Sequence, residues 1–187
     1  MTITNLTKKL TFAEYLNYDN GTDNSYEFVD GELILMNPPI GLHALILFLL
    51  HNKLLAEINR LQLPWVILQM VGVRTAFNRA RIPDLCIVNR EQIQQYLDKS
   101  AVLESPPLLS IEIVSESSTI IDYRYKRSEY AAAGIPEYWI IDPESHKVTV
   151  LQLIEGFYEE KVYRNKDLIV SPTFPELSLT VEELWNV

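Results

Sequence analysis

The stretch Leu108-Leu-Ser-Ile-Glu-Ile-Val114 decides the fold, because it places one carboxylate inside a run that is otherwise apolar except for Ser110. Such a run is typical of a strand that is covered on both faces of a sheet. By the two-residue alternation of a strand, Glu112 shares a face with Ser110 and Val114. An ionised glutamate is costly to bury without a partner. The stretch therefore predicts a central strand with a functional carboxylate, the alternative being a solvated glutamate near a strand end.

The segments around this strand predict helices and hairpins. Asp30-Gly31 is typical of a two-residue hairpin turn, and Gly134 and Pro136 end a helix. Asn78–Arg81 is expected to be a polar, basic turn. The predicted helices cover 11–18, 43–61, 91–97, 119–133 and a final turn from Thr180, and the predicted strands cover 26–29, 32–36, 65–76, 85–88, 108–114, 138–141, 147–153 and 157–163. This order predicts an α/β (α+β) fold, with one mixed β-sheet flanked by helices and a β-hairpin near each end.

Length and composition exclude several classes of protein. The chain has 187 residues, of which 48% are hydrophobic and 22% charged. These values favour one globular domain over 1–187 and exclude a disordered or collagen-like chain. The single cysteine, Cys86, lies in an apolar run and is expected to be buried. Because 1–9 carries no secretory signal and the apolar run Ala44–Leu50 is too short to span a bilayer, a soluble cytoplasmic protein is expected.

The charge balance bears on the class of substrate. Twenty-five acidic residues against 16 basic ones give a net charge of −9, which by itself argues against a nucleic-acid partner. Charge is local, however: Gly72–Arg81 holds three arginines and no carboxylate, and Arg124, Lys126 and Arg127 add three positive charges. A phosphate substrate is therefore not excluded, although weak and salt-sensitive DNA binding is expected.

A second carboxylate follows a proline at the start of another strand. Pro83 keeps the chain extended before Asp84, which leads into 85–88. If the two strands are neighbours, Asp84 and Glu112 can converge on one divalent ion, because Mg²⁺ prefers carboxylates, waters and substrate phosphate. Alone, Asp84 could equally accept hydrogen bonds in a turn.

The helix after the Glu112 strand adds an amine. Asp122, Lys126 and Tyr130 lie four residues apart, on one helix face. An exposed Asp122–Lys126 ion pair is one interpretation. The other is that Lys126 reaches a phosphate oxygen or the attacking water. Glu27 is either a further metal ligand or a surface strand residue, and His43 either positions substrate or water or is a structural residue at a helix start.

In this order the residues resemble the PD-(D/E)XK nuclease superfamily, and more closely the Uma-type restriction endonuclease-like family of bacteria. The resemblance extends from about Phe12 to Leu184. The stretches that carry it are Tyr26-Glu-Phe-Val-Asp-Gly-Glu32, His43, Pro83-Asp84, Ile111-Glu-Ile-Val-Ser115, Ser118-Thr119, Asp122, Lys126, Tyr130 and Gly134-Ile-Pro-Glu-Tyr-Trp-Ile-Ile-Asp142.

The resemblance implies a metal-dependent phosphodiesterase. Asp84 and Glu112 would hold Mg²⁺ or Mn²⁺, with Glu27 and the carbonyl of Ile113 as further ligands. The superfamily pattern has a lysine two residues after the glutamate, where this chain has Val114. Lys126 would then supply the amine from the next helix.

The expected function is hydrolysis of DNA phosphodiester bonds by metal-activated water. A homodimer is expected if both strands are cut, and no membrane association is expected. A nuclease fold that binds without cutting and a hydrolase of small phosphoesters are the alternatives. In a third interpretation the polar residues only stabilise the fold, and Tyr138 and Trp139 are expected to be core residues. The expected substrate contacts are His43, Arg79, Arg81, Asp122 and Tyr130.

Overall fold

Residues 9–186 of this computed structural model are described, and they form two β-sheets. The smaller sheet has the order β2 (Glu32–Leu35), β1 (Tyr26–Val29), β5 (Arg79–Arg81), β4 (Gly72–Ala76) and β7 (Val102–Leu103). The larger has the order β11 (Phe157–Arg164), β10 (Lys147–Ile154), β9 (Glu137–Asp142), β8 (Leu109–Ile113), β6 (Leu85–Asn89) and β3 (Trp65–Leu68). The helices are α1 (Phe12–Leu16), α2 (Gly41–Arg60), α3 (Arg90–Gln94), the π-helix η1 (Ile121–Lys126), α4 (Arg127–Ala132) and the 3₁₀ helix η2 (Val181–Leu184). The segment 1–8, where no secretory signal is expected, lies outside the described residues.

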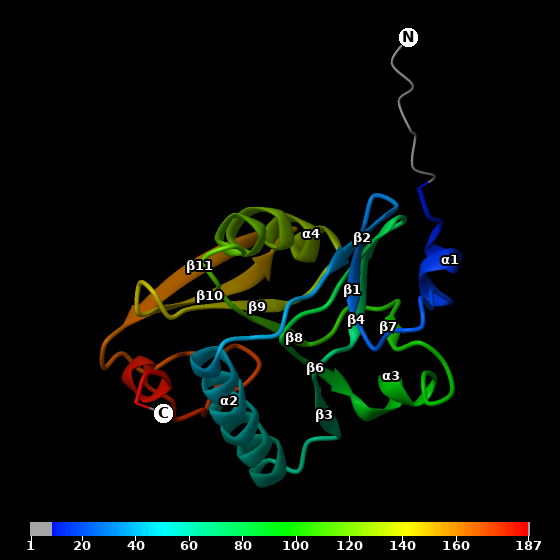
Figure 1. Cartoon of the computed structure of the whole chain (residues 1–187). Helices are drawn as coiled ribbons and strands as arrows, with labels where there is room; N and C mark the ends of the chain where they lie inside the picture. The colour runs from blue at the N-terminus through cyan, green and yellow to red at the C-terminus, as the bar shows by residue number, and fades with distance from the viewer. Residues whose placement is uncertain (1–8, 187) are drawn as a thin grey trace.

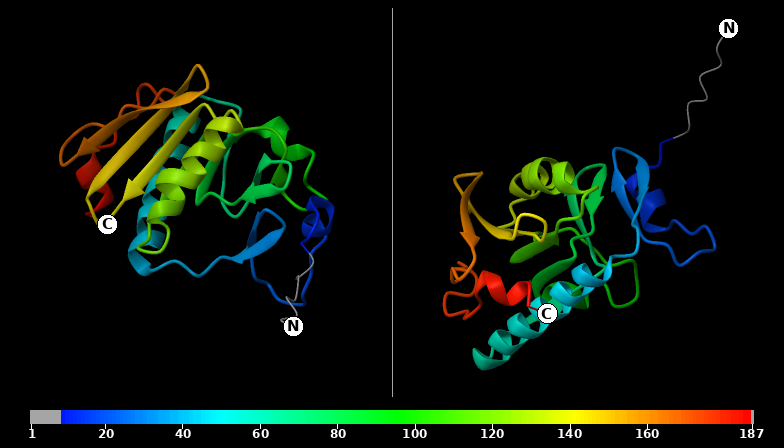
Figure 2. Two further views of the ribbon diagram at one scale, coloured as in Figure 1. Left: turned by 90° about the horizontal axis from the view of Figure 1, so that it is seen from above. Right: turned by 60° about the vertical axis from the view of Figure 1, so that its left-hand side comes forward.

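Strand β8 lies inside the larger sheet, as its sequence predicts. It pairs in parallel with β9 and antiparallel with β6, and all five of its residues are buried. Helix α2 covers one face of this sheet, while η1 and α4 cover the other (Figures 1 and 2). The side chains of Leu109, Ile111 and Ile113 join the core with α2. Glu112 therefore points toward η1 and α4.

The first hairpin follows from its turn residues. Asp30 and Gly31 have φ angles of 52° and 89°, the left-handed conformations that a type I′ turn requires. The turn pairs Val29 with Glu32 and continues the register to Tyr26 and Leu35. The predicted hairpin at the start of the chain is confirmed, as is the one near its end, where β10 pairs with β11.

The predicted α+β class with mixed β-pairing flanked by helices is confirmed, but the expectation of one strand over 65–76, and with it of one sheet, is wrong. The chain leaves the larger sheet after Leu68, and Met70 takes a φ of 57°. It then enters the smaller sheet as β4, which pairs with β5 and β7. The segment 78–81 is correspondingly not a simple turn, because Arg79 already begins β5. A left-handed residue between two apolar runs thus divides them between two sheets.

The long predicted helix over 119–133 contains a π-helical segment, η1, two residues after its start. Gly134 follows its end at a φ of 79°, and the amide of Ile135 donates to the carbonyl of Tyr130 at 3.0 Å. The predicted end of the helix is therefore confirmed. A π-helical turn changes which side chains share a face, and such turns often occur at functional sites.

Helix α2 is longer than the apolar run Ala44–Leu50. It has 20 residues and, by length and composition, is the one described helix that could cross a membrane; 28% of its most apolar 18-residue stretch is buried. The shortness of Ala44–Leu50 therefore does not by itself exclude a membrane span. One such helix is weak evidence for a membrane span, because core helices of water-soluble proteins pass the same test.

Candidate active site

The amine of Lys126 is the centre of a buried cluster between the two sheets. Its Nζ lies 2.9 Å from Glu112 Oε2, 3.3 Å from Asp122 Oδ1 and 3.4 Å from Glu27 Oε1. These residues come from η1, β8 and β1, so three separate elements meet at one ammonium group. All four side chains are buried. The interpretation of Asp122–Lys126 as an exposed surface pair is therefore wrong.

Burial and charge oppose each other at Lys126. Loss of water disfavours the ammonium form, yet the carboxylates of Glu112, Glu27 and Asp122 together raise its pKa above the ordinary value. Lysine is thus held in its charged state in the interior. It can stabilise negative charge or donate hydrogen bonds, but it is not suited to remove a proton.

Glu112 is held between two donors. The Tyr130 hydroxyl donates to its Oε1 at 2.6 Å, and Lys126 lies at its Oε2. Burial raises the pKa of Glu112 well above the ordinary value, and the neighbouring carboxylates of Asp122 and Asp84 add to the rise, against the effect of Lys126. Because burial is the main cause of this rise, a further cation beside Glu112 would favour its ionised form.

Asp84 is the carboxylate of the site with the greatest access to solvent. The pair Leu85–Ile111 places it opposite Glu112 in the antiparallel ladder of β6 and β8. Its Oδ2 accepts the Ile113 amide at 2.7 Å, and its Oδ1 lies 3.1 Å from Nε2 of His43, near the start of α2. The side chains of Asp84 and His43 are 19% and 15% exposed, against 4% for Glu112. Asp84 and His43 are therefore at the side of the cluster that solvent reaches.

Glu27 is held by a second cation. Arg81 Nη1 donates to its Oε2 at 2.8 Å, and the Ile82 amide donates to its Oε1 at 3.1 Å. Burial opposes ionisation of Glu27, but Lys126 and Arg81 outweigh it and hold the pKa of Glu27 below the ordinary value. The alternative of a surface glutamate is wrong, because Glu27 is buried.

The two arginines expected to contact phosphates are engaged in ion pairs instead. Arg81 is buried, and besides Glu27 it binds both oxygens of Glu129, at 2.8 and 2.7 Å. Arg79 binds Asp30 and lies 3.3 Å from Glu129. The expectation of a direct phosphate contact is corrected for Arg81, because its guanidinium is enclosed by carboxylates. Arg79 keeps a third of its side chain exposed, and its role in binding stays a prediction.

Two further expected substrate contacts are also corrected by burial. Tyr130 is fully buried and contacts Glu112, and Asp122 is 1% exposed and contacts Lys126. Glu129 is the member of the cluster that sequence reasoning missed. It follows Lys126 by three residues, so the helical spacing that selected Asp122 and Tyr130 could have found it. Tyr138 and Trp139 are fully buried, as expected for core residues.

The donor set suits a hard divalent cation, although it is not a complete cage. Within residues 9–186, no group of three or more His, Cys, Asp or Glu side chains is arranged to hold a metal ion. Mg²⁺, however, commonly uses one or two protein carboxylates together with waters and substrate phosphate. Asp84 and Glu112 provide two carboxylates, each with acceptor capacity beyond its present hydrogen bonds. Four buried carboxylates also face only two buried cations in this cluster: Glu27, Glu112, Asp122 and Glu129 against Arg81 and Lys126.

Comparison with known proteins places this domain in the restriction endonuclease-like class. A family model described as Uma2, putative restriction endonuclease, matches residues 12–182, and the chain belongs to that family. A similar solved structure is that of a putative nuclease belonging to DUF820 from Anabaena variabilis ATCC 29413. It superposes with a TM-score of 0.78 at 20% identity, covering 95% of this chain and 98% of that one. No curated protein matches the chain.

Proposed function

We propose that the protein is a metal-dependent endonuclease that hydrolyses DNA phosphodiester bonds, with Mg²⁺ or Mn²⁺ as the cofactor. The observation that carries the proposal is the position of the Lys126 amine, 2.9 Å from the carboxylate of Glu112. The superfamily pattern asks for an amine beside that carboxylate, and Val114 cannot supply it. Lys126 supplies it from η1, so the substitution at Val114 does not remove the required chemistry. Membership of the family supports a nucleic acid as the substrate.

The metal ion would be held by Asp84 and Glu112, with the carbonyl of Ile113 as a further oxygen ligand. When bound, it supplies Lewis-acid stabilisation of the negative charge on a phosphoryl oxygen. The excess of carboxylates in the cluster makes such an ion electrostatically favourable. Glu27 would be a further carboxylate ligand, because Arg81 and the Ile82 amide hold its carboxylate in the ionised form beside Lys126.

The side chains of the site have different roles in the proposed reaction. Lys126 remains protonated, so it stabilises the charge that develops on the phosphorus oxygens. His43, paired with Asp84 at the accessible side, orients the attacking water. Tyr130 positions Glu112, and Arg81 with Glu129 positions Glu27. The polar residues thus form one layer that contacts substrate and a buried layer that orients it.

The test is a cleavage assay on single-stranded, duplex and branched DNA, and on mononucleotides, in Mg²⁺, in Mn²⁺ and in a chelator. We expect metal-dependent cleavage of DNA, abolished by Glu112→Gln and by Asp84→Asn. Glu116→Gln is the matched control, because Glu116 is exposed and lies only four residues from Glu112. Binding of Mn²⁺, followed by calorimetry, should weaken in the first two variants only.

Three results would contradict the proposal. Full activity of Glu112→Gln would mean that the active site lies elsewhere. Cleavage of mononucleotides alone would indicate a hydrolase of small phosphoesters. Absence of both Mn²⁺ binding and cleavage would indicate a nuclease fold that binds without cutting.

A further inference from the structure

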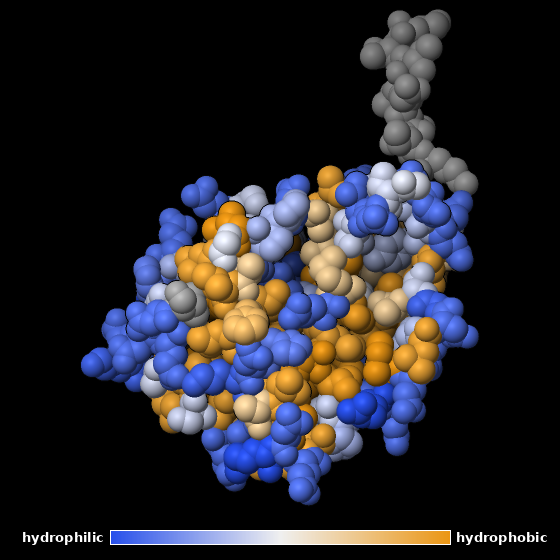
Figure 3. All heavy atoms as spheres, turned by 60° about the horizontal axis from the view of Figure 1, so that its bottom comes forward, coloured by the Kyte–Doolittle hydropathy of each residue, from blue (hydrophilic) through white to orange (hydrophobic). Residues whose placement is uncertain are grey.

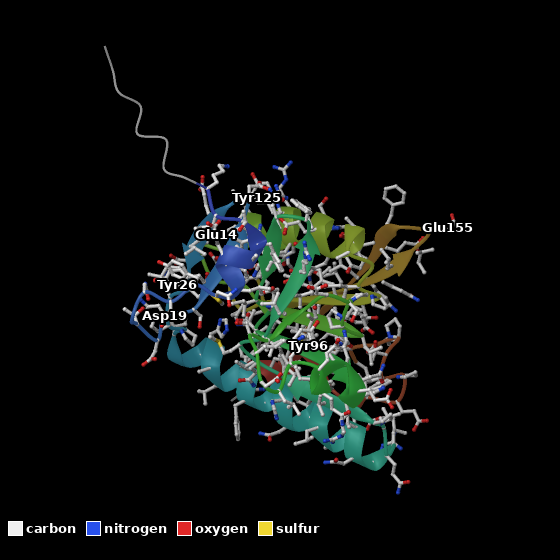
Figure 4. All side chains as sticks on the ribbon, turned by 90° about the vertical axis from the view of Figure 1, so that its right-hand side faces the viewer. Glu14, Asp19, Tyr26, Tyr96, Tyr125 and Glu155 are labelled. Carbon is white, nitrogen blue, oxygen red and sulfur yellow. The ribbon has the colours of Figure 1, made fainter. Side chains whose placement is uncertain are left out.

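Helix α2 carries two apolar stripes, of which the fold uses only one. Ile46, Leu50, Leu54 and Ile58 face the core. On the opposite side, Leu45, Phe48 and Leu55 are 48%, 67% and 39% exposed. Figure 3 views the molecule with the side on which α2 lies turned forward, and groups of hydrophobic residues lie among hydrophilic ones on this face. Exposed apolar patches of this kind on a water-soluble domain mark an interaction surface.

The outer stripe has the spacing of a helix–helix seam. Leu45, Phe48, Asn52, Leu55 and Asn59 follow one another at alternating intervals of three and four residues, and the two asparagines are exposed. Such a 3.5-residue repeat keeps one line of side chains facing a partner helix. From Leu45 to Asn59 the stripe is about 21 Å long at 1.5 Å per residue. It therefore offers more than two heptads to a second helix.

The stripe is also free of charge along its length. The α2 charges belong to other contacts: Lys53 pairs with Glu183 at 2.6 Å, and Arg60 pairs with Glu57 and Glu176. The chain as a whole has a charge of −9, so two copies repel each other over most of their surfaces. The uncharged stripe is a surface where this repulsion is smallest.

We propose that the outer stripe of α2 is a symmetric interface that binds the same stripe of a second copy of this chain. Around a two-fold axis each residue meets its own counterpart or a neighbour of it, so the surface must be self-complementary. An asparagine amide satisfies this condition, because it both donates and accepts. Asn52 lies in the middle of the stripe and makes no side-chain hydrogen bond to another described residue. A polar asparagine inside an apolar seam also fixes the register and the number of helices.

The turn at Gln69 and Met70 extends the surface of the outer stripe. The charge balance argues against a lipid bilayer as the partner that covers this surface. The amide of Gln69 lies 3.2 Å from Nδ1 of His51, and the next residue, Met70, is 60% exposed. A helix that binds anionic lipid carries lysines and arginines on its polar face. Here Lys53 and Arg60 are already paired, and the chain is acidic. The proposal does not rest on the nuclease activity.

The experiment measures the molar mass of the full chain by sedimentation and light scattering over a range of concentrations. We expect a dimer whose dissociation constant rises by about 30-fold or more in Phe48→Glu, as for the truncation of an interface hot spot. The control is Phe77→Glu, because Phe77 is 87% exposed but lies on the β4–β5 turn. It should leave the dimer unchanged, and both variants should keep the wild-type melting temperature at a concentration where the wild type is monomeric.

A cross-linking variant tests the register directly. Asn52→Cys should form a disulfide between two chains under mild oxidation, whereas Asn78→Cys, on the exposed β4–β5 turn, should not. The native Cys86 is buried and adds no background. A monomer at every concentration, or a dimer that Phe77→Glu and Phe48→Glu weaken equally, would overturn the proposal. So would a monomer that binds phosphatidylglycerol vesicles through Phe48. A dimer without nuclease activity would refute only the proposed function.

Discussion

Replacing Lys126 by methionine removes the one cation that three buried carboxylates share. The stem of the side chain is kept, but the ammonium within 3.4 Å of Glu112, Asp122 and Glu27 is lost. Removing one partner from a buried ion pair typically costs about 3–5 kcal/mol, because it leaves an uncompensated charge. For a chain of this length that cost corresponds to a fall in melting temperature of about 6–20 °C.

The loss should depend on pH with a definite sign. Without Lys126, the raised pKa values of Glu112 and Asp122 rise further. The folded state then binds more protons than the unfolded state, so stability falls as pH rises from the unfolded value of about 4.3 through the folded pKa. The difference between the variant and the wild type should therefore widen from mildly acidic to neutral pH.

The assay is urea unfolding at several pH values in the presence of a chelator. Lys166→Met, at an exposed lysine, is the control and should stay within about 0.5 kcal/mol of the wild type. Lys126→Met combined with Glu112→Gln should recover part of the stability but none of the cleavage. If Lys126→Met costs less than about 1 kcal/mol at neutral pH, the reasoning that Lys126 offsets buried carboxylates is refuted.

Three further changes have expected outcomes. Tyr130→Phe removes the 2.6 Å hydrogen bond to Glu112, so it should lower the free energy of unfolding in urea by about 1.5–3 kcal/mol and reduce cleavage activity. Tyr125→Phe, at an exposed tyrosine, should change neither, and equal effects of the two variants would contradict the positioning role of Tyr130. The hydrogen bond from Lys53 lowers the pKa of Glu183 to about 2, so the stability that this pair contributes is present above the unfolded pKa and is lost as pH falls toward 2. Glu183→Gln should flatten the acid limb of the curve of stability against pH by less than about 1 kcal/mol, and an unchanged acid limb would argue against a contribution from this pair. Leu54→Ala should cost about 2–5 kcal/mol because Leu54 is fully buried, and a cost below 1 kcal/mol would mean that α2 packs loosely.

Local patterns in the sequence predicted much of the fold because their causes are local. The turn residues Asp30 and Gly31 determine the first hairpin, and Gly134 ends the helix that carries Lys126. The apolar run around Glu112 predicted a strand buried on both faces, since only side-chain alternation and burial are needed for that inference. The division of 65–76 was missed because a left-handed Met70 has no strong signal in its residue type.

The candidate site was also predicted in part by local patterns and in part only by the folded structure. Spacing alone put Asp122, Lys126 and Tyr130 on one face of a helix, and the apolar surroundings of Glu112 marked it as unusual. Spacing could not show that Arg81 is enclosed by Glu27 and Glu129, because these three residues come from different elements and meet only in the folded chain. An arginine in a basic segment is equally consistent with a phosphate contact or a buried ion pair, and burial decides between the two.

The sequence by itself determined the hairpins, the central strand, the helix end and the residue types of the site, since turn geometry and periodicity act over a few residues. The tertiary structure decided which charges are buried and which partners they share. It brought Lys126 into contact with Glu112, Asp122 and Glu27, so that an amine absent at Val114 is supplied from the next helix. It also left one stripe of α2 uncovered. Both results depend on packing between distant segments, which no local pattern specifies.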